Sequence, residues 1–158
     1  MQAWRICDAR YAHDLSGSGA AIFGGRWNPI GTPAIYAALN PATAALETFA
    51  HLGNHDKQQR VLVTLTLPDD PSLYSHLNET DLPIGWDSLP PGPPSMECGE
   101  QFLLSASFLG LVVPSILVPE ARNIVLNPRH PGFAQVAAKQ MRPFTFDARL
   151  FGKTPSNE

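Results

Sequence analysis

The sequence has no basic excess, few cysteines and no long apolar run. Its 158 residues carry 11 Lys and Arg against 14 Asp and Glu, a net charge of −3. Binding nucleic acid by phosphate neutralisation needs a basic excess, so direct nucleic-acid binding is not expected. Two distant cysteines, Cys7 and Cys98, form neither a metal-binding spacing nor a disulfide framework, which fits a reducing cytoplasm. No run approaches the roughly 20 apolar residues of a membrane span, and no apolar signal region opens the chain. We therefore expect a cytoplasmic protein without a membrane segment.

Several motifs that mark common enzyme classes are also missing. The glycines of "GSGAAI" at 17–22 begin a dinucleotide fingerprint, but Ile22 stands where its last glycine belongs and no strand is expected before it. There is no P-loop and no GxSxG elbow. His51 and His55 are four residues apart, but Gly53 lies between them and HExxH is absent, so we expect surface histidines and no metal.

The length suits a single domain with one core. We expect residues 1–152 to form that domain and residues 153–158 to be a frayed tail. Charge is unevenly spread, because residues 61–121 contain eight acidic side chains and no Lys or Arg, whereas residues 122–158 contain six basic and two acidic ones. The two segments form either ordinary solvated faces or a docking face for a partner of opposite charge.

The first half of the chain contains a glycine-rich segment followed by a strand and a helix. Residues 14–33 hold five glycines and two prolines, which predicts a long loop without a helix, and such loops often bind ligands. "AIYAAL" at 34–39 predicts a strand. Asn40 then predicts an N-cap, with Pro41 at the first helical position and Gly53 closing a helix over 41–52. This helix is apolar nearly all round, which predicts that it is buried.

The second half predicts short strands and one further helix. "VLVTLTLP" at 61–68 reads as a strand, and the prolines of 83–94 predict a loop. A helix is expected from Ser95, followed by three short strands in "FLGLVVPS", "ILVP" and "NIVLNP" that form a second sheet. Together these elements predict an α+β fold.

Three side chains in the first half could carry chemistry, and each has an ordinary structural alternative. Arg26 lies among glycines that let backbone amides and a guanidinium approach a phosphate, although it could instead cover Trp27 or pair with a carboxylate. Tyr36 could stack on a ligand or pack in the core. Glu47 falls opposite the Leu46 stripe of its helix, which predicts a solvated side chain, yet no charged residue surrounds it. A lone carboxylate of this kind often serves a cationic ligand.

These residue types are compatible with cleavage of NAD at its nicotinamide bond. An ordinary glycosidase needs two carboxyl groups, one of them to protonate the leaving oxygen. Nicotinamide leaves from a cationic pyridinium and needs no proton, so one carboxylate that stabilises the cationic transition state is sufficient. The residues alone make this chemistry permissible and do not select it.

Several strings in the sequence resemble RES-domain proteins, the toxin partners of RES–Xre toxin–antitoxin pairs. The resemblance covers nearly the whole chain, and the order of "GGRWN" and "VPS…VPE…N…LNP" is its most specific part. Phe102 departs from the resemblance, since the family often has tryptophan there. The matching strings are "WRI" at 4–6, "GSGAAIFGGRWNPIGTPAIYAA" at 17–38, "LETFAHL" at 46–52, "LPIGW" at 82–86 and "VVPSILVPEARNIVLNPRHPGF" at 112–133.

The resemblance implies an ADP-ribosyltransferase-like fold with short strands in two small sheets, and NAD as a substrate without a further cofactor. It identifies Arg26, Tyr36, Glu47 and Ser115 as the family's active-site residues, with Arg5 and Asn127 lining the pocket. Arg26 would bind the pyrophosphate, Tyr36 would stack near the nicotinamide, and Ser115 would orient Glu47 or the substrate, although its hydroxyl could instead satisfy a turn.

The resemblance also implies growth arrest by NAD loss, a homodimer and an Xre-type helix-turn-helix antitoxin as partner. The acceptor stays open, since water gives hydrolysis, phosphate gives phosphorolysis and a protein side chain gives ADP-ribosylation. The alternatives are an inactive nucleotide-binding module and, with least support, a serine esterase using Ser115.

Overall fold

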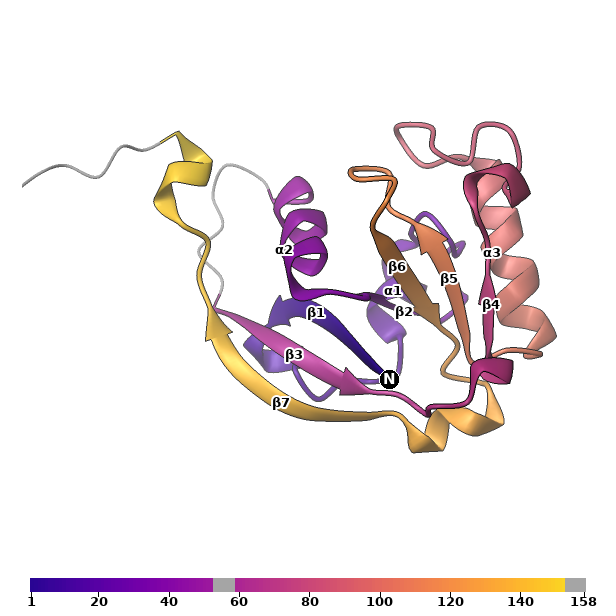
Figure 1. Cartoon of the computed structure of the whole chain (residues 1–158), viewed down its shortest axis with the longest axis horizontal. Helices are drawn as coiled ribbons and strands as arrows, with labels where there is room; N and C mark the ends of the chain where they lie inside the picture. The colour runs from indigo at the N-terminus through magenta and orange to yellow at the C-terminus, as the bar shows by residue number, and fades with distance from the viewer. Residues whose placement is uncertain (53–58, 153–158) are drawn as a thin grey trace, which may run out of the picture.

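The computed structural model describes residues 1–52 and 59–152, and it has a mixed α+β architecture (Figure 1). Three α-helices and seven strands are found in this part of the chain. The strands are β1 (Gln2–Asp8), β2 (Ile35–Ala38), β3 (Arg60–Thr66), β4 (Tyr74–His76), β5 (Gly110–Pro114), β6 (Arg122–Leu126) and β7 (Ala137–Phe144). The helices are α1 (Ser18–Phe23), α2 (Pro41–Ala50) and α3 (Pro93–Ser105).

All seven strands belong to one sheet with the order β4-β5-β6-β2-β1-β3-β7. Only β4 and β5 pair in parallel, and the other neighbours are antiparallel. The two halves of the sheet meet at β1 and β2, where the single register pair Trp4↔Ala38 joins them. Figure 1 shows β1, β3 and β7 on one side of this junction and β6, β5 and β4 on the other.

The expected α+β class is confirmed, but the expectation of two small sheets is wrong. The narrow β1–β2 junction makes the two halves one hydrogen-bonded sheet. An apolar run predicts that a segment is a strand without showing which strands become neighbours. The order of the strands is decided by long-range pairing, such as that of β2 with β6.

The helix predicted over 41–52 is α2, and its start is confirmed. The Asn40 side chain accepts a hydrogen bond from the Thr43 backbone N–H at 2.8 Å, and Pro41 is the first helical residue. The helix ends at Ala50 with His51 as its C-cap, and the predicted closing Gly53 lies outside the described residues. The following strand predictions at 34–39 and 61–68 correspond to β2 and β3.

The prediction that α2 is buried is wrong. Leu46 is 41% exposed, whereas Thr43 and Ala44 on another side of the helix are buried. Small side chains allow α2 to approach β1 and β2 closely, so the Thr43–Ala44 side faces the sheet. Because Glu47 is four residues after Thr43 and three after Ala44, it lies on this inner side.

Three other expectations need correction. Residues 18–23 of the glycine-rich segment form α1, because its glycines lie at the ends and at one exposed position of a short helix. Residues 116–119 lie in the turn that joins β5 to β6 and form no strand. Helix α3 begins at Pro93, two residues before the predicted start, since proline is tolerated in a first turn.

Sequence patterns did not reveal β1, β4 or β7. Strand β7 contains Lys139, Arg142 and Pro143, which hide its strand character, and it lies at an edge of the sheet where such residues are tolerated. Strand β4 is only three residues long. In the described ranges, no helix is long and apolar enough to cross a membrane.

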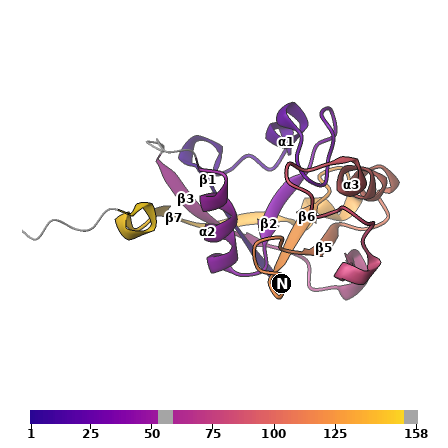
Figure 2. The same cartoon turned by 90° about the horizontal axis from the view of Figure 1, so that it is seen from above.

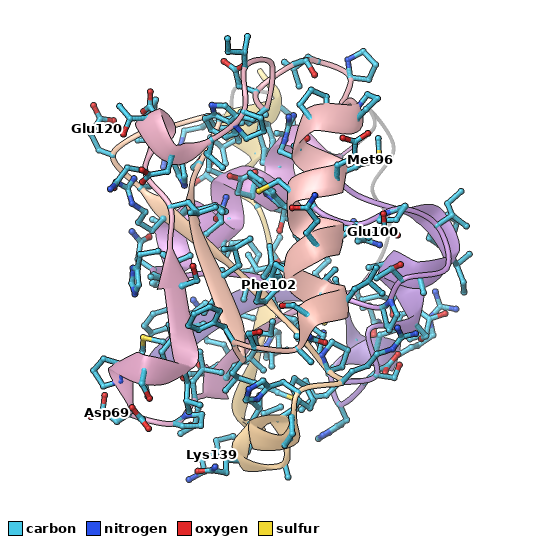
Figure 3. The ribbon with its side chains drawn as sticks, turned by 90° about the vertical axis from the view of Figure 1, so that its right-hand side faces the viewer. Asp69, Met96, Glu100, Phe102, Glu120 and Lys139 are labelled. Atoms are coloured by element: carbon cyan, nitrogen blue, oxygen red, sulfur yellow. The ribbon has the colours of Figure 1, made fainter. Side chains whose placement is uncertain are left out.

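The sheet separates two apolar clusters, as the alternation of side chains in β2 shows. Ile35 and Ala37 belong to one cluster, and Ala34 and Tyr36 belong to the other. The second cluster includes Phe102 of α3, which covers the β4–β5 half of the sheet (Figures 2 and 3). Figure 3 shows Phe102 on the side of α3 that faces the strands, with Glu100 pointing away from them. The Tyr36 face is the one on which the candidate site is built.

Candidate functional site

The segment "GGRWN" forms a tight turn in which the backbones of Gly25 and Asn28 pair. The Gly25 N–H donates to the Asn28 carbonyl at 2.9 Å, and the Asn28 N–H donates in return at 3.4 Å. Gly24 has a φ of +70°, which favours glycine. A Cβ on Gly25 would lie 2.6 Å from the Tyr36 hydroxyl oxygen, so this turn has no room for a larger residue. Arg26 and Trp27 are thereby placed at its tip.

Asn28 and Tyr36 hold this turn in place from inside. The Tyr36 hydroxyl donates to Asn28 Oδ1 at 2.7 Å and accepts from the Trp27 backbone N–H at 2.9 Å. Asn28 is fully buried, and its Nδ2 donates to the carbonyls of Ala20 and Thr32. Burial raises the pKa of Tyr36 well above its ordinary value. The Tyr36 hydroxyl therefore stays protonated, and its single proton is used by the turn.

The Arg26 guanidinium is held by carbonyl groups of the proline-rich loop. Its Nη1 donates to the Trp86 carbonyl at 2.6 Å and its Nη2 to the Ser88 carbonyl at 3.1 Å. Partial burial lowers the pKa of Arg26, while the negative charges of Asp87 and Glu47 oppose this change. An arginine remains a cation under such conditions. The two carbonyl bonds leave further guanidinium N–H groups available to an anion.

Glu47 accepts two side-chain hydrogen bonds from the β5–β6 hairpin. Ser115 Oγ donates to Glu47 Oε1 at 2.8 Å, and Asn123 Nδ2 donates to the same oxygen at 2.5 Å. The Ser115 hydroxyl oxygen in turn accepts the backbone N–H groups of Leu117 at 3.1 Å and Val118 at 3.2 Å. Ser115 is almost fully buried. The carboxylate is thus held by residues far from it in sequence.

Arg26 and Glu47 interact electrostatically without forming an ion pair. The charge of Glu47 acts on the pKa of Arg26, but within residues 1–52 and 59–152 no salt bridge joins the two. Each charge is held by neutral hydrogen-bonding groups. Such an arrangement leaves a cation and an anion available to a ligand on one face of the sheet.

The structure does not bring Arg5 into this cluster. Trp4, which precedes Arg5 in β1, pairs with Ala38 on the site face. Because successive side chains of a strand alternate, Arg5 points to the opposite face. Arg5 Nη2 donates to backbone carbonyls of the segment after β1, including those of Tyr11 at 3.1 Å and Asp14 at 2.7 Å. This contact braces the turn after β1.

Asn127 also lies away from Glu47, at the opposite end of β6 from Asn123. It is fully buried, its Nδ2 donates to the Leu103 carbonyl at 2.8 Å, and its Oδ1 accepts the Arg129 backbone N–H. These bonds connect the end of α3 with the end of β6. Its position supports a structural role in the fold.

The sequence predictions did not include Asn28 or Asn123, although Asn28 lies in "GGRWN" and Asn123 in "NIVLNP". Asn123 was detectable as the polar member of the alternating face of β6 that also contains Val125, the register partner of Tyr36. Asn28 gave no such signal, because its role depends on a loop conformation. A buried asparagine must satisfy its amide, and here it does so by fixing the turn.

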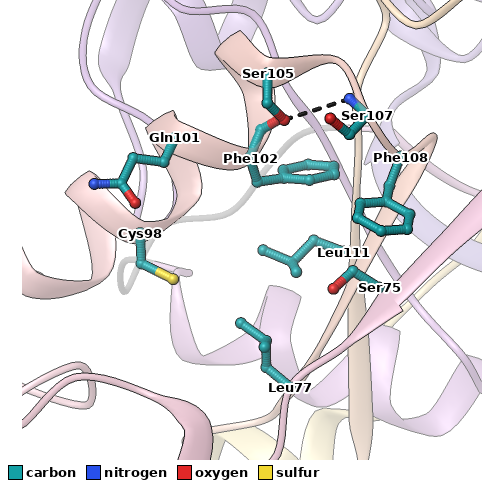
Figure 4. Close-up of a pocket in the computed structure, with 9 residues that line it drawn as sticks. All are labelled: Ser75, Leu77, Cys98, Gln101, Phe102, Ser105, Ser107, Phe108 and Leu111. Atoms are coloured by element: carbon teal, nitrogen blue, oxygen red, sulfur yellow. Dashed lines mark hydrogen bonds between the residues drawn. The ribbon is translucent and has the colours of Figure 1, made fainter.

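A separate cavity of about 250 Å³ lies between α3 and strands β4 and β5 (Figure 4). Its walls include Leu77, Cys98, Phe102, Phe108 and Leu111. Burial raises the pKa of the Cys98 thiol, which disfavours the reactive thiolate. The cavity contains none of the residues around Arg26 or Glu47. Nor do the described residues include a group of three or more His, Cys, Asp or Glu side chains that could hold a metal ion.

Comparisons with known proteins agree with this architecture. The RES domain family matches residues 2–147. A protein of Sphingobium sp. (strain YBL2) named "Prs ADP-ribosylating toxin" is 41% identical over 155 residues, covering 95% of this chain and 96% of the relative. A "Toxin Res" of Yersinia enterocolitica is 39% identical, covering 95% of this chain and 99% of the relative.

A solved structure shows the same fold. The Mycobacterium tuberculosis MbcT–MbcA toxin–antitoxin complex contains a chain that matches with a TM-score of 0.68 at 22% identity. The match covers 91% of this chain and 84% of that chain. At this identity the likeness concerns the fold alone.

Proposed function

This chain belongs to the RES domain family, and from that premise we propose that it is the toxin of a toxin–antitoxin pair that cleaves NAD. The bond to be broken joins nicotinamide to C1′ of the ribose, and its electron pair leaves with the neutral nicotinamide. The proposal rests above all on Glu47, whose charge is held beside the sheet by Ser115 and Asn123. One carboxylate is sufficient because the leaving group needs no proton.

Each remaining residue has a proposed task that its contacts permit. Arg26 binds the pyrophosphate through the N–H groups that the Trp86 and Ser88 carbonyls leave unused. Tyr36 offers only its ring to the nicotinamide end, since its hydroxyl is engaged by Trp27 and Asn28. Ser115 positions Glu47. Glu47 stabilises the oxocarbenium-like transition state at C1′. Water then bonds C1′ and loses a proton, or an oxygen of inorganic phosphate bonds C1′ in its place.

The decisive experiment compares NAD consumption by the wild-type protein and Glu47→Gln. We expect nicotinamide release to fall ~10²–10³-fold, because the amide keeps the shape of the side chain and loses its charge. Glu97→Gln is a matched control, since Glu97 is exposed on α3 and is not part of the cluster. Equal rates for wild type and Glu47→Gln would refute the assignment of Glu47. Running the assay with and without inorganic phosphate distinguishes phosphorolysis from hydrolysis.

ADP-ribosylation of a protein is the second candidate, and the name of the 41% identical Sphingobium relative favours it. The same cleavage step would then end with a protein nucleophile attached to C1′. Incubation of this protein with NAD and purified Prs, followed by mass spectrometry, tests the transfer. An ADP-ribose adduct that is absent with Glu47→Gln supports the transferase, and nicotinamide release without an adduct supports the NAD-degrading enzyme.

An inactive nucleotide-binding module makes a different prediction. It would be stabilised by NAD in a thermal melt and would release no nicotinamide.

The proposed antitoxin partner is supported by the toxin–antitoxin complex among the structural neighbours. Co-expression with a neighbouring helix-turn-helix gene should relieve growth arrest, and size-exclusion chromatography of the toxin alone tests the proposed homodimer.

A further inference from the structure

Asn123 is the residue of the cluster to which neither the sequence patterns nor the family resemblance gave a role. We propose that Asn123 is a positioning residue, which holds the Glu47 carboxylate in the orientation needed for cleavage of the nicotinamide bond. This inference rests on the proposed NAD-cleaving function.

Both hydrogen bonds to Glu47 reach the same carboxylate oxygen. Asn123 Nδ2 and Ser115 Oγ donate to Oε1, at 2.5 and 2.8 Å. Among the described residues, no hydrogen bond or ion pair to Oε2 is found. The two donors therefore fix the carboxyl plane through one oxygen and leave the other oxygen to a ligand.

Backbone pairing makes Asn123 a rigid donor. Its Cα has register partners on both sides, Ala38 of β2 and Val113 of β5, so it occupies the interior of the sheet. Ser115 is fixed by the same hairpin, because its backbone N–H donates to the Ala121 carbonyl at 3.0 Å. The donors thus form one unit, while Glu47 comes from α2, a separate element.

The two donors are not equivalent. Ser115 Oγ already accepts two backbone N–H groups, so its single proton is directed at Glu47. Asn123 makes the shorter of the two bonds to Oε1, and its amide is tied to no other acceptor among the described residues. Without Asn123 the carboxylate can rotate about the remaining bond. Its charge then no longer lies where the transition state develops.

The kinetic test is a double-mutant cycle. We expect Asn123→Ala to lower kcat about 10- to 100-fold with little change in KM for NAD, because a hydrogen bond to a charged group is lost. Asn123→Asp keeps the shape but has no amide donor, so it should not restore kcat. In a Glu47→Ala background, Asn123→Ala should cause no further loss. A purely structural residue would lower activity by a similar factor in both backgrounds, and that result would overturn the proposal.

A second measurement is independent of activity. In a ¹⁵N–¹H spectrum, the Asn123 side-chain amide, assigned by its loss in Asn123→Ala, should have one strongly downfield proton that returns toward the ordinary position in Glu47→Ala. Asn78, exposed before the 3-10 helix Glu79–Asp81, is the control, and its substitution by Ala should alter neither kcat nor this resonance. An unchanged Asn123 resonance in Glu47→Ala would refute the contact. Absence of nicotinamide release from the wild type would refute the proposed function while this spectrum still tests Asn123.

Discussion

The two charged ends of the site are built in opposite ways. Arg26 lies on a turn whose shape is fixed by buried side chains, and its own guanidinium is held by backbone carbonyls of another loop. Glu47 lies on a regular helix, and its carboxylate is held by the side chains of Ser115 and Asn123. The arginine end depends on loop conformation, whereas the glutamate end depends on how a helix meets a hairpin.

This difference indicates how the site keeps two opposite charges unpaired. Carbonyl dipoles hold the cation, and a hydroxyl and an amide hold the anion, so neither charge is cancelled by the other. Dipoles that are already oriented in the folded protein need little further movement when charge develops in a transition state, so little free energy is spent on reorienting them. Substitutions that affect one end alone should therefore separate the two contributions.

Gly99→Ala should cause the largest loss of stability, and it acts on the arginine end. A Cβ on Gly99 would lie 2.1 Å from the Trp27 carbonyl oxygen, so α3 or the turn must move. We expect the free energy of unfolding, measured by urea denaturation, to fall by about 3 kcal/mol. NAD cleavage should fall with it, because Trp27 adjoins Arg26.

Gly19→Ala is the matched control, because apart from its own stretch of α1 no described atom lies within 4 Å of the added Cβ. Its stability should be equal to or slightly above that of the wild type, since alanine favours helix. If the two variants unfold at the same urea concentration, close packing of α3 on the turn does not stabilise this end.

Tyr36→Phe should have the next largest effect. It removes the hydroxyl that bonds Asn28 and Trp27, so two buried polar groups lose a partner and stability should fall by about 2 kcal/mol. KM for NAD should rise as the turn loosens. Tyr74→Phe is the control, because that hydroxyl donates to Pro68 far from the cluster. It should reduce stability and leave KM unchanged, and the same KM in both variants would contradict a role of Tyr36 in holding the turn.

The helix-and-strand content near the site was predictable from the sequence, while the sheet order was not. Asn40, Pro41 and the apolar run of β2 are local signals, and each is confirmed. The burial prediction for α2 was wrong because apolar content does not show which side of a helix contacts the sheet. Thr43 and Ala44 are small enough for close approach, and that property outweighed hydrophobicity.

The site residues were only partly predictable for a similar reason. The family resemblance predicted Arg26, Tyr36, Glu47 and Ser115 as site residues, and the structure brings Glu47 and Ser115 into contact. The resemblance pointed to Asn127 and not to Asn123, because only the pairing of β6 with β2 and β5 places Asn123 beside Glu47. A contact between residues 76 positions apart leaves no local pattern.

Asn40→Ala should cause a smaller change, confined to the glutamate end. Loss of the bond to the Thr43 N–H should reduce stability by about 1 kcal/mol. The first turn of α2 then frays, and we expect kcat for NAD to fall several-fold with KM unchanged. Asn40→Asp keeps a capping oxygen and should restore both values. A raised KM with normal kcat would show that α2 orders the binding of NAD and not the placement of Glu47.

Asp147→Asn should have the smallest effect, although it also lies behind the glutamate end. The 3-10 helix Ala148–Phe151 packs Phe151 against Phe49 of α2, with ring centroids 5.3 Å apart.

Hydrogen bonds from the Arg149 side chain and backbone lower the pKa of Asp147. A lowered pKa in the folded state means that stabilisation is present above the unfolded value of 3.8 and is lost as pH falls below it. Because both side chains of the pair are exposed, solvent screens it. Thermal melts at neutral pH should therefore differ little between Asp147→Asn and wild type, and any difference should vanish in acid. A large loss at neutral pH would instead show that this terminal segment holds α2, and with it Glu47, in place.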